Sequence, residues 1–233
     1  MDHQLGRLRD VLDETGVGRR TRLWFCSDNG PEGRTVSSTV ESSDSTYLAL
    51  VGAGPGSTGP FHGRKRDLFE GGIRVPGLLE WPAKIEPGRV TDAVVCTSDF
   101  LPTMVDLFDL PMPGSRVLDG VSIKSVLDGC GGNRCRPIAF ESRGMFALVD
   151  NRFKIVHVPK NVDKFNRHTK PAPTAPSTFM LFDLLDDPGE KHNIAKEYPE
   201  IVDRLARQVY VWRESYQKSL QGQDYRSSTP PLR

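Results

Sequence analysis

The sequence lacks any long apolar run, and no stretch approaches the ~20 consecutive apolar residues that a transmembrane helix requires. It also lacks a charge imbalance, because 31 Lys and Arg residues face 30 Asp and Glu residues. No strong field therefore draws the chain toward nucleic acid or an anionic membrane, and we expect neither as a partner. No signal peptide is visible. The compartment stays open, although a periplasmic or secreted location would be favoured if the full-length protein carries a signal peptide.

Cysteine is scarce, with four residues in the chain, and no paired C-x-x-C or histidine-rich spacing indicates a zinc site. Cys26 and Cys96 lie in apolar runs and are expected to behave as small buried hydrophobic residues. Cys130 and Cys135 flank a loop short enough for a local disulfide. A disulfide or two free thiols are both favoured over a catalytic pair, and the redox compartment is undecided.

Composition and length describe an ordinary globular protein, with 37% hydrophobic and 26% charged residues in a chain of 233. That length suits one large domain, or a domain and a half. The first element predicted is an amphipathic helix over residues 2–15, which places Leu5, Leu8, Val11 and Leu12 on one face. No strand precedes this helix, so we expect that the chain begins in the middle of a domain.

The next elements predict an α/β fold with a mostly parallel sheet flanked by helices. A buried strand is expected over residues 22–26, further strands over 73–81 and 94–96, and a helix over 98–108. In such sheets ligands gather at the carboxyl ends of the strands, and Asp28 and Asn29 follow the first strand.

The pattern changes after Cys135 to short strands separated by turns, which predicts a small antiparallel sheet, closed by a long helix from Pro199. The expected domains are therefore 1–134, the C-terminal part of an α/β domain; 135–220, the antiparallel-sheet subdomain with its closing helix; and 221–233, a disordered tail. Two long segments, 30–62 and 160–178, are expected to be surface loops.

Asp28 and Asn29 offer a carboxylate and an amide oxygen, which are donors that calcium and magnesium prefer. Considered alone, Asp-Asn-Gly is more simply a hairpin turn. Lys65 could hold an anionic group, with Arg64 and Arg66 raising the local potential, but a solvated basic loop is the simpler interpretation. Glu70 is expected to serve a turn in which Gly71 and Gly72 supply backbone freedom.

The spacing of these residues resembles the second half of a type I sulfatase, a family with the alkaline-phosphatase-like fold, whose N-terminal part would then be missing here. Four further segments are similar to the family: a helix like the one that precedes the Asp-Asn pair, a D-x-x-P-T helix, the loop after it, and a C-terminal segment. The segments that carry the resemblance are 2–12, Ser27-Asp28-Asn29-Gly30, Gly63-x-Lys65-x4-Glu70-Gly71-Gly72-Ile73-Arg74-Val75-Pro76, 98–107, 118–122 and 182–195.

The resemblance implies roles for three residues. Asp28 and Asn29 would be two ligands of a divalent cation, Ca²⁺ or Mg²⁺. Lys65 would contact the sulfate oxygens and stabilise charge as the ester is cleaved. His62 stands where the family commonly has arginine, and no role is assigned to it.

The formylglycine nucleophile of the family arises from a C/S-x-P/A-x-R motif, which this sequence lacks. Cys130 has an arginine at the right spacing, Arg134, but a glycine where proline or alanine belongs. Cys135 has the proline but no arginine. We reject both as nucleophiles.

The resulting hypothesis is a sulfatase fragment, from a hydrolase of aryl or carbohydrate sulfate esters, which supplies part of the metal and sulfate site and is inactive alone. The alternatives are a phosphonate or phosphodiester hydrolase of the same superfamily, and a non-catalytic binding module with a degenerate sulfatase fold.

Overall fold

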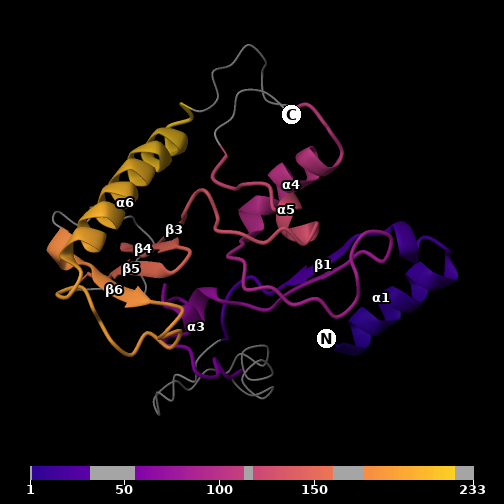
Figure 1. Ribbon diagram of the computed structural model, residues 1–233, viewed down its shortest axis with the longest axis horizontal. Coiled ribbons are helices and arrows are strands. Elements are labelled where there is room, and N and C mark those ends of the chain that lie inside the picture. Colours follow the sequence, from indigo (N-terminus) through magenta and orange to yellow (C-terminus); the bar gives the residue numbers. More distant parts are fainter. Residues whose placement is uncertain (1, 32–55, 113–117, 160–175, 224–233) are drawn as a thin grey trace, which may run out of the picture. The chain divides into compact units, whose positions relative to one another are not determined.

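A computed structural model of the chain describes residues 2–31, 56–112, 118–159 and 176–223 (Figure 1). The contacts divide the chain into two units. The first contains residues 1–28, 75–111 and 118–135, and the second contains residues 29–74, 112–117 and 136–233. The domain boundaries expected from the sequence stay a prediction. The residues expected to form the Pro31–His62 loop, the proline-rich loop and the tail lie largely outside the described residues.

The first unit joins helices to a two-stranded sheet. Strand β1 pairs antiparallel with β2, with Leu23 opposite Glu80 and Cys26 opposite Gly77. Trp24 of β1 packs on Phe100, with ring centroids 3.8 Å apart. The elements are α1 (Asp2–Glu14), η1 (Gly18–Arg20), β1 (Leu23–Cys26), β2 (Gly77–Glu80), η2 (Thr97–Asp99), α4 (Phe100–Leu107) and α5 (Lys124–Leu127).

The second unit contains the antiparallel sheet, with strand order β3-β4-β5-β6. Helix α6 packs on this sheet, and together they bury a core that includes Phe146, Ile155, Leu181 and Leu205 (Figure 1). The elements are α3 (Glu70–Ile73), β3 (Ile138–Ser142), β4 (Met145–Asp150), β5 (Phe153–His157), η3 (Pro176–Thr178), β6 (Met180–Asp183) and α6 (Pro199–Leu220).

Two local expectations need correction. Residues 94–96 form no strand, because the Cys96 N–H donates to the Asp99 carboxylate (2.9 Å) and Cys96 instead begins a helical turn. Only residues 77–80 of the expected 73–81 strand form β2, since α3 includes Ile73 and Pro76 cannot donate a backbone hydrogen bond. The described strands pair only antiparallel, so no parallel neighbour of β1 lies among the described residues.

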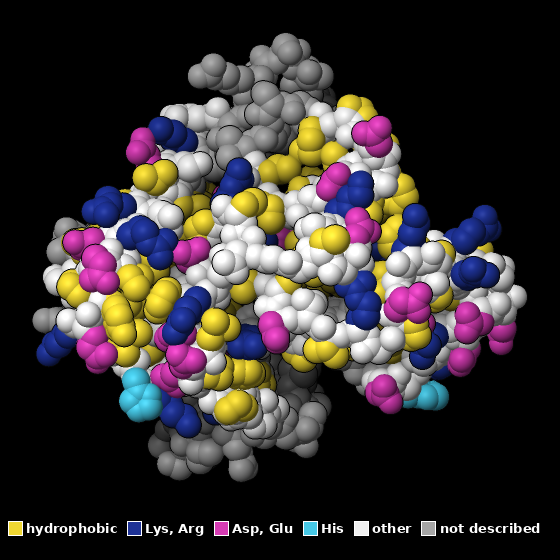
Figure 2. Space-filling model, in the orientation of Figure 1, with side chains coloured by type: hydrophobic (Ala, Val, Ile, Leu, Met, Phe, Trp, Pro, Cys, Tyr) yellow, Lys and Arg dark blue, Asp and Glu magenta, His cyan; other side chains and the backbone are white. Residues whose placement is uncertain are grey.

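The surface of the described residues is mixed in charge. Figure 2 shows basic and acidic side chains interspersed over the visible face, in keeping with the near-zero net charge. Helix α1 buries none of its residues, and Val11 on its apolar face is 52% exposed. Among the described residues, no helix combines the length and apolar composition needed to cross a bilayer.

A buried ion pair organises the first unit. Arg134 donates to both carboxylate oxygens of Asp99, at 2.6 and 2.8 Å, and Asp99 also accepts the Val121 N–H (2.8 Å). Burial alone would raise the pKa of Asp99, but the hydrogen bonds from Arg134, Val121 and Cys96 outweigh it, and the pKa lies below its usual range. The pair therefore joins η2 to the segment after α5, and the Val121 contact joins η2 to the loop before α5.

We expect Arg134→Met to destabilise the first unit by about 3–5 kcal/mol at neutral pH, because a buried carboxylate loses its partner. The pKa of Asp99 is lower in the folded than in the unfolded chain, so the pair stabilises fully above the unfolded value of about 3.9 and less as pH falls through the folded value. The loss of unfolding free energy in the variant should therefore be smaller in acid than at neutral pH.

Urea unfolding at several pH values measures this difference. Lys124→Met is the matched control, because Lys124 faces Asp106 at 3.7 Å with both side chains more than 40% exposed. That change should cost under about 1 kcal/mol. Equal losses for the two variants would contradict the importance of the buried pair.

Candidate functional site

The Asp28-Asn29-Gly30 segment follows β1 and does not form a hairpin turn. The partner of β1 is β2, far along the chain, and the Gly30 N–H donates instead to the Gly72 carbonyl (2.8 Å). Asp28 is exposed, Asn29 is half-buried and Gly30 is buried. The structure therefore removes the simple turn explanation and joins this segment to the Glu-Gly-Gly motif.

Three glycines allow this contact because their backbones approach too closely for any side chain. A Cβ at Gly30 would lie 1.9 Å from the Gly71 carbonyl oxygen, and one at Gly72 would lie 2.2 Å from the Asp67 carbonyl oxygen. At Gly71 the Cβ would meet the Gly63 carbonyl oxygen at 2.3 Å. The close approach, rather than an unusual backbone conformation, explains why glycine occupies these positions.

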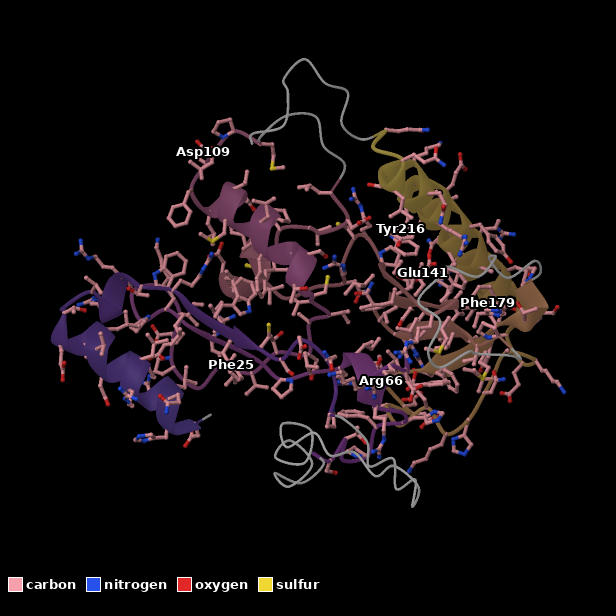
Figure 3. All side chains as sticks on the ribbon, turned by 180° about the vertical axis from the view of Figure 1, so that it is seen from behind. Phe25, Arg66, Asp109, Glu141, Phe179 and Tyr216 are labelled. Atoms are coloured by element: carbon pink, nitrogen blue, oxygen red, sulfur yellow. The ribbon has the colours of Figure 1, made fainter. Side chains whose placement is uncertain are left out.

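Lys65 lies in a turn that is bound to the end of the same segment. The Asp67 N–H donates to the Arg64 carbonyl (2.9 Å) and closes the turn, and the Lys65 N–H donates to the Pro31 carbonyl (3.1 Å). The side chain of Lys65 is half-buried, which argues against a fully solvated basic loop. Arg66 has φ +84°, a conformation that is costly for a side-chain-bearing residue, and it lies beside α3 (Figure 3).

His62 supports this turn through its backbone and its ring. Its carbonyl accepts the Gly71 N–H (2.6 Å), and its exposed ring stacks on the buried Phe69 with centroids 4.1 Å apart. The turn that carries Lys65 is thus fixed to α3 on one side and to Pro31 on the other.

Glu70 does more than serve a turn, and the sequence analysis missed its partners. Its carboxylate accepts from Lys154 Nζ at 2.9 Å, and the same ammonium lies 2.8 Å from Glu190 Oε1. The second oxygen of Glu190 accepts the Glu70 N–H at 2.6 Å. Lys154 and the Glu190 side chain are fully buried. A lysine within the apolar run of β5 was the signal that could have indicated this cluster.

Asp28 and Asn29 have the chemistry to hold a hard cation but not enough ligands. They supply two of the roughly six to eight oxygens that calcium takes. Among the residues that the structure describes, no three His, Cys, Asp or Glu side chains form a metal-binding group. The donor types therefore fit a divalent cation, and other ligands would have to complete its coordination.

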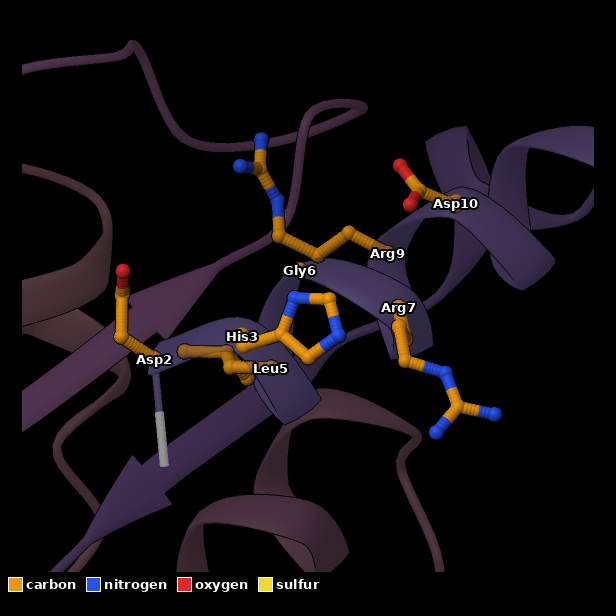
Figure 4. A pocket seen from close by; sticks show the side chains of 7 residues that line it. All are labelled: Asp2, His3, Leu5, Gly6, Arg7, Arg9 and Asp10. Carbon is orange, nitrogen blue, oxygen red and sulfur yellow. The ribbon is translucent and has the colours of Figure 1, made fainter.

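A second surface feature is a hollow along α1, lined by side chains of that helix (Figure 4). Both acidic and basic residues line it, including Asp2, Arg9 and Asp10. Arg9 forms an exposed ion pair with Glu80 at 2.8 Å. This arrangement is an ordinary solvated helix face and brings together none of the predicted site residues.

The four cysteines differ in exposure but share one oxidation state in the structure. All four are free thiols, and Cys130 and Cys135 are exposed and form no disulfide. Cys26 and Cys96 are partly buried rather than fully buried. Arg134, the arginine that follows Cys130 at the spacing of the nucleophile motif, forms an ion pair with Asp99. The rejection of Cys130 as a nucleophile stays a prediction.

Residues 1–110 match the family described as Sulfatase, and residues 58–215 match the family described as N-sulphoglucosamine sulphohydrolase, C-terminal. The chain belongs to the sulfatase family. It is 31% identical to arylsulfatase A of Bos taurus over 222 residues, which cover 90% of this chain and 40% of that relative. The sulfatase chain thus spans well under half the length of this relative.

Solved structures confirm the alkaline-phosphatase-like fold of this sulfatase chain. A Bacteroides thetaiotaomicron protein from a locus for the metabolism of multiple glycosaminoglycans aligns with TM-score 0.68 and 24% identity, over 93% of this chain and 43% of its own. A phosphonate monoester hydrolase of Agrobacterium radiobacter aligns with TM-score 0.53 and 20% identity, over 92% and 39%. Sulfatases act on sulfate esters and generally use a metal ion and a formylglycine.

Proposed function

We propose that this chain supplies part of the metal and sulfate-binding site of an enzyme that hydrolyses sulfate esters. One observation carries the proposal: the Gly30 N–H donates to the Gly72 carbonyl, and the Pro31 carbonyl accepts the Lys65 N–H. These two backbone hydrogen bonds attach the Asp28-Asn29 segment to α3 and to the turn that bears Lys65. Hard oxygen donors and a cationic side chain are thereby held on neighbouring segments, as a bound cation and a sulfate group together would require.

In this proposal Lys65 binds the sulfate oxygens and stabilises the negative charge that develops as the ester bond breaks. Asp28 and Asn29 would hold the divalent cation, calcium or magnesium, which would polarise a sulfate oxygen. The backbone contacts of Lys65 and Gly30 limit the freedom of both segments before substrate arrives, so less ordering is needed on binding. The proposed substrate is an aryl or carbohydrate sulfate.

The chain should bind inorganic sulfate through Lys65. We expect Lys65→Ala to weaken sulfate binding at least tenfold, because a hydrogen bond to a charged group contributes about 1.5–3 kcal/mol. Lys65→Arg should retain part of the affinity, since the charge remains. Lys218→Ala is the control, as Lys218 is an exposed lysine paired with Glu214 on α6. Calorimetric titration measures the affinities, and equal binding by wild type and Lys65→Ala would contradict the proposal.

The second candidate is a phosphonate or phosphodiester hydrolase, which is favoured by the fold shared with the phosphonate monoester hydrolase. Comparing turnover of a sulfate ester and a phosphodiester by the full-length protein distinguishes the two. Preference for the sulfate ester supports the first proposal, and preference for the phosphodiester supports the second. Metal-dependent binding of both without turnover would indicate a non-catalytic module.

A further inference from the structure

The cluster of Glu70, Lys154 and Glu190 holds one residue of α3 from two directions. Lys154 on β5 binds the side chain of Glu70 at 2.9 Å, while Glu190, in the turn after β6, accepts its backbone N–H at 2.6 Å. Glu70 is 84 residues from Lys154 and 120 from Glu190 in the sequence. The cluster is therefore a long-range connection, within the second unit, between the antiparallel sheet and the first residue of α3.

Burying three charges is a poor way to gain stability, because the loss of hydration offsets much of the attraction between them. Glu190 also has φ +53°, a conformation that costs free energy for a residue with a side chain. Glu70 has a further cation nearby, Arg74, at 3.6 Å. A strained residue and a desolvated charge cluster are better explained by the geometry that they impose than by a contribution to stability.

The position of α3 constrains Lys65 through two sets of backbone contacts. Helix α3 accepts the Gly30 N–H at the Gly72 carbonyl, and it donates the Gly71 N–H to the His62 carbonyl. His62 begins the turn that bears Lys65, and Gly30 precedes Pro31, which accepts the Lys65 N–H. The close glycine contacts leave α3 little room to move without displacing both segments.

We propose that Glu190 and Lys154 are positioning residues for Lys65, which fix α3 through Glu70 and so hold the sulfate-binding lysine next to the Asp28-Asn29 segment. The inference rests on the sulfate-binding role proposed for Lys65. The antiparallel sheet would thus contribute to the function of the site, although the ligand-binding residues lie outside that sheet.

Amide hydrogen exchange without sulfate tests the positioning directly. In Glu190→Ala the Glu70 N–H loses its acceptor, and we expect the Gly30 and Lys65 amides to exchange at least tenfold faster than in the wild type. Glu190→Gln keeps an acceptor oxygen and should restore most of the protection. Sulfate affinity should fall at least threefold in Glu190→Ala and recover in Glu190→Gln.

Glu141→Ala is the matched control. Glu141 lies on β3 of the same sheet with its side chain 6% exposed, and its charged partner is Arg213 at 3.6 Å rather than any residue of α3. This variant should leave the exchange of Gly30 and Lys65 unchanged. Faster exchange of these amides in Glu141→Ala to the same extent, or unchanged exchange in Glu190→Ala, would overturn the proposal.

A second variant covers the case in which Glu190→Ala does not fold. The triple replacement Glu70→Leu, Lys154→Met and Glu190→Leu removes all three charges, a change that often preserves the stability of buried clusters. Loss of protection at Lys65 in this folded variant supports positioning, and wild-type protection overturns it. Absence of sulfate binding by the wild type would contradict the sulfate-binding role of Lys65. It would leave the positioning test intact, because the exchange experiment contains no sulfate.

Discussion

Replacing Lys154 with methionine should destabilise the second unit by about 3–5 kcal/mol, because the change leaves two buried carboxylates without their shared cation. The ammonium is fully buried, so water cannot take its place. The matched control is Arg204→Met, which breaks an ion pair with Asp150 on the same sheet, with Arg204 46% exposed. That control should cost about 1 kcal/mol or less. Urea unfolding compares the two variants.

The loss in Lys154→Met should depend on pH. Burial, and to a lesser extent the nearby Glu70, raises the pKa of Glu190, and Lys154 opposes this rise. A carboxyl group with a higher pKa in the folded chain opposes folding above that pKa, and the penalty disappears as pH falls below the unfolded value of about 4.3. Removing Lys154 enlarges the penalty. The loss of unfolding free energy in Lys154→Met should therefore be smaller at pH 5 than at pH 7. A loss that grows in acid would contradict this explanation.

The Gly72→Ala substitution should abolish sulfate binding and destabilise the second unit by about 3 kcal/mol or more. The added Cβ would lie 2.2 Å from the Asp67 carbonyl oxygen and 2.6 Å from that of Arg64, so the turn that bears Lys65 must move. Backbone atoms cannot rotate away as a flexible side chain can. Calorimetric titration with sulfate and thermal unfolding measure both effects.

Gly77→Ala provides the control for this change. Gly77 lies in β2, and a Cβ there would meet no atom within 4 Å. Its effect should be under about 1 kcal/mol, with sulfate binding unchanged. If Gly72→Ala bound sulfate as tightly as Gly77→Ala, the close packing of α3 on the Lys65 turn would have no functional importance.

The local elements of the second unit could be predicted from the sequence because their signals are local. The small antiparallel sheet expected after Cys135 is present, and α6 begins at Pro199 as expected. Short apolar runs separated by turns, and a stripe on a long helix, depend on few long-range contacts. The strand expected at residues 94–96 does not form, because a competing local contact, the Cys96 N–H donating to the Asp99 carboxylate three residues on, begins a helical turn.

The candidate site was only partly predictable. The resemblance identified Asp28, Asn29 and Lys65, and their roles remain proposals. The lysine in the apolar run of β5 signals a buried charge, but no spacing in the sequence links Glu70 to partners 84 and 120 positions away. Pairing of this kind depends on how the sheet and α3 meet in three dimensions.

We propose that this chain carries a sulfate-binding lysine and two metal ligands but no nucleophile. The most direct test incubates the 233-residue chain with an aryl sulfate and Ca²⁺, and follows release of the phenol alongside binding of sulfate. We predict sulfate binding that depends on Lys65 and no release of phenol. Metal-dependent hydrolysis by this chain would contradict the account.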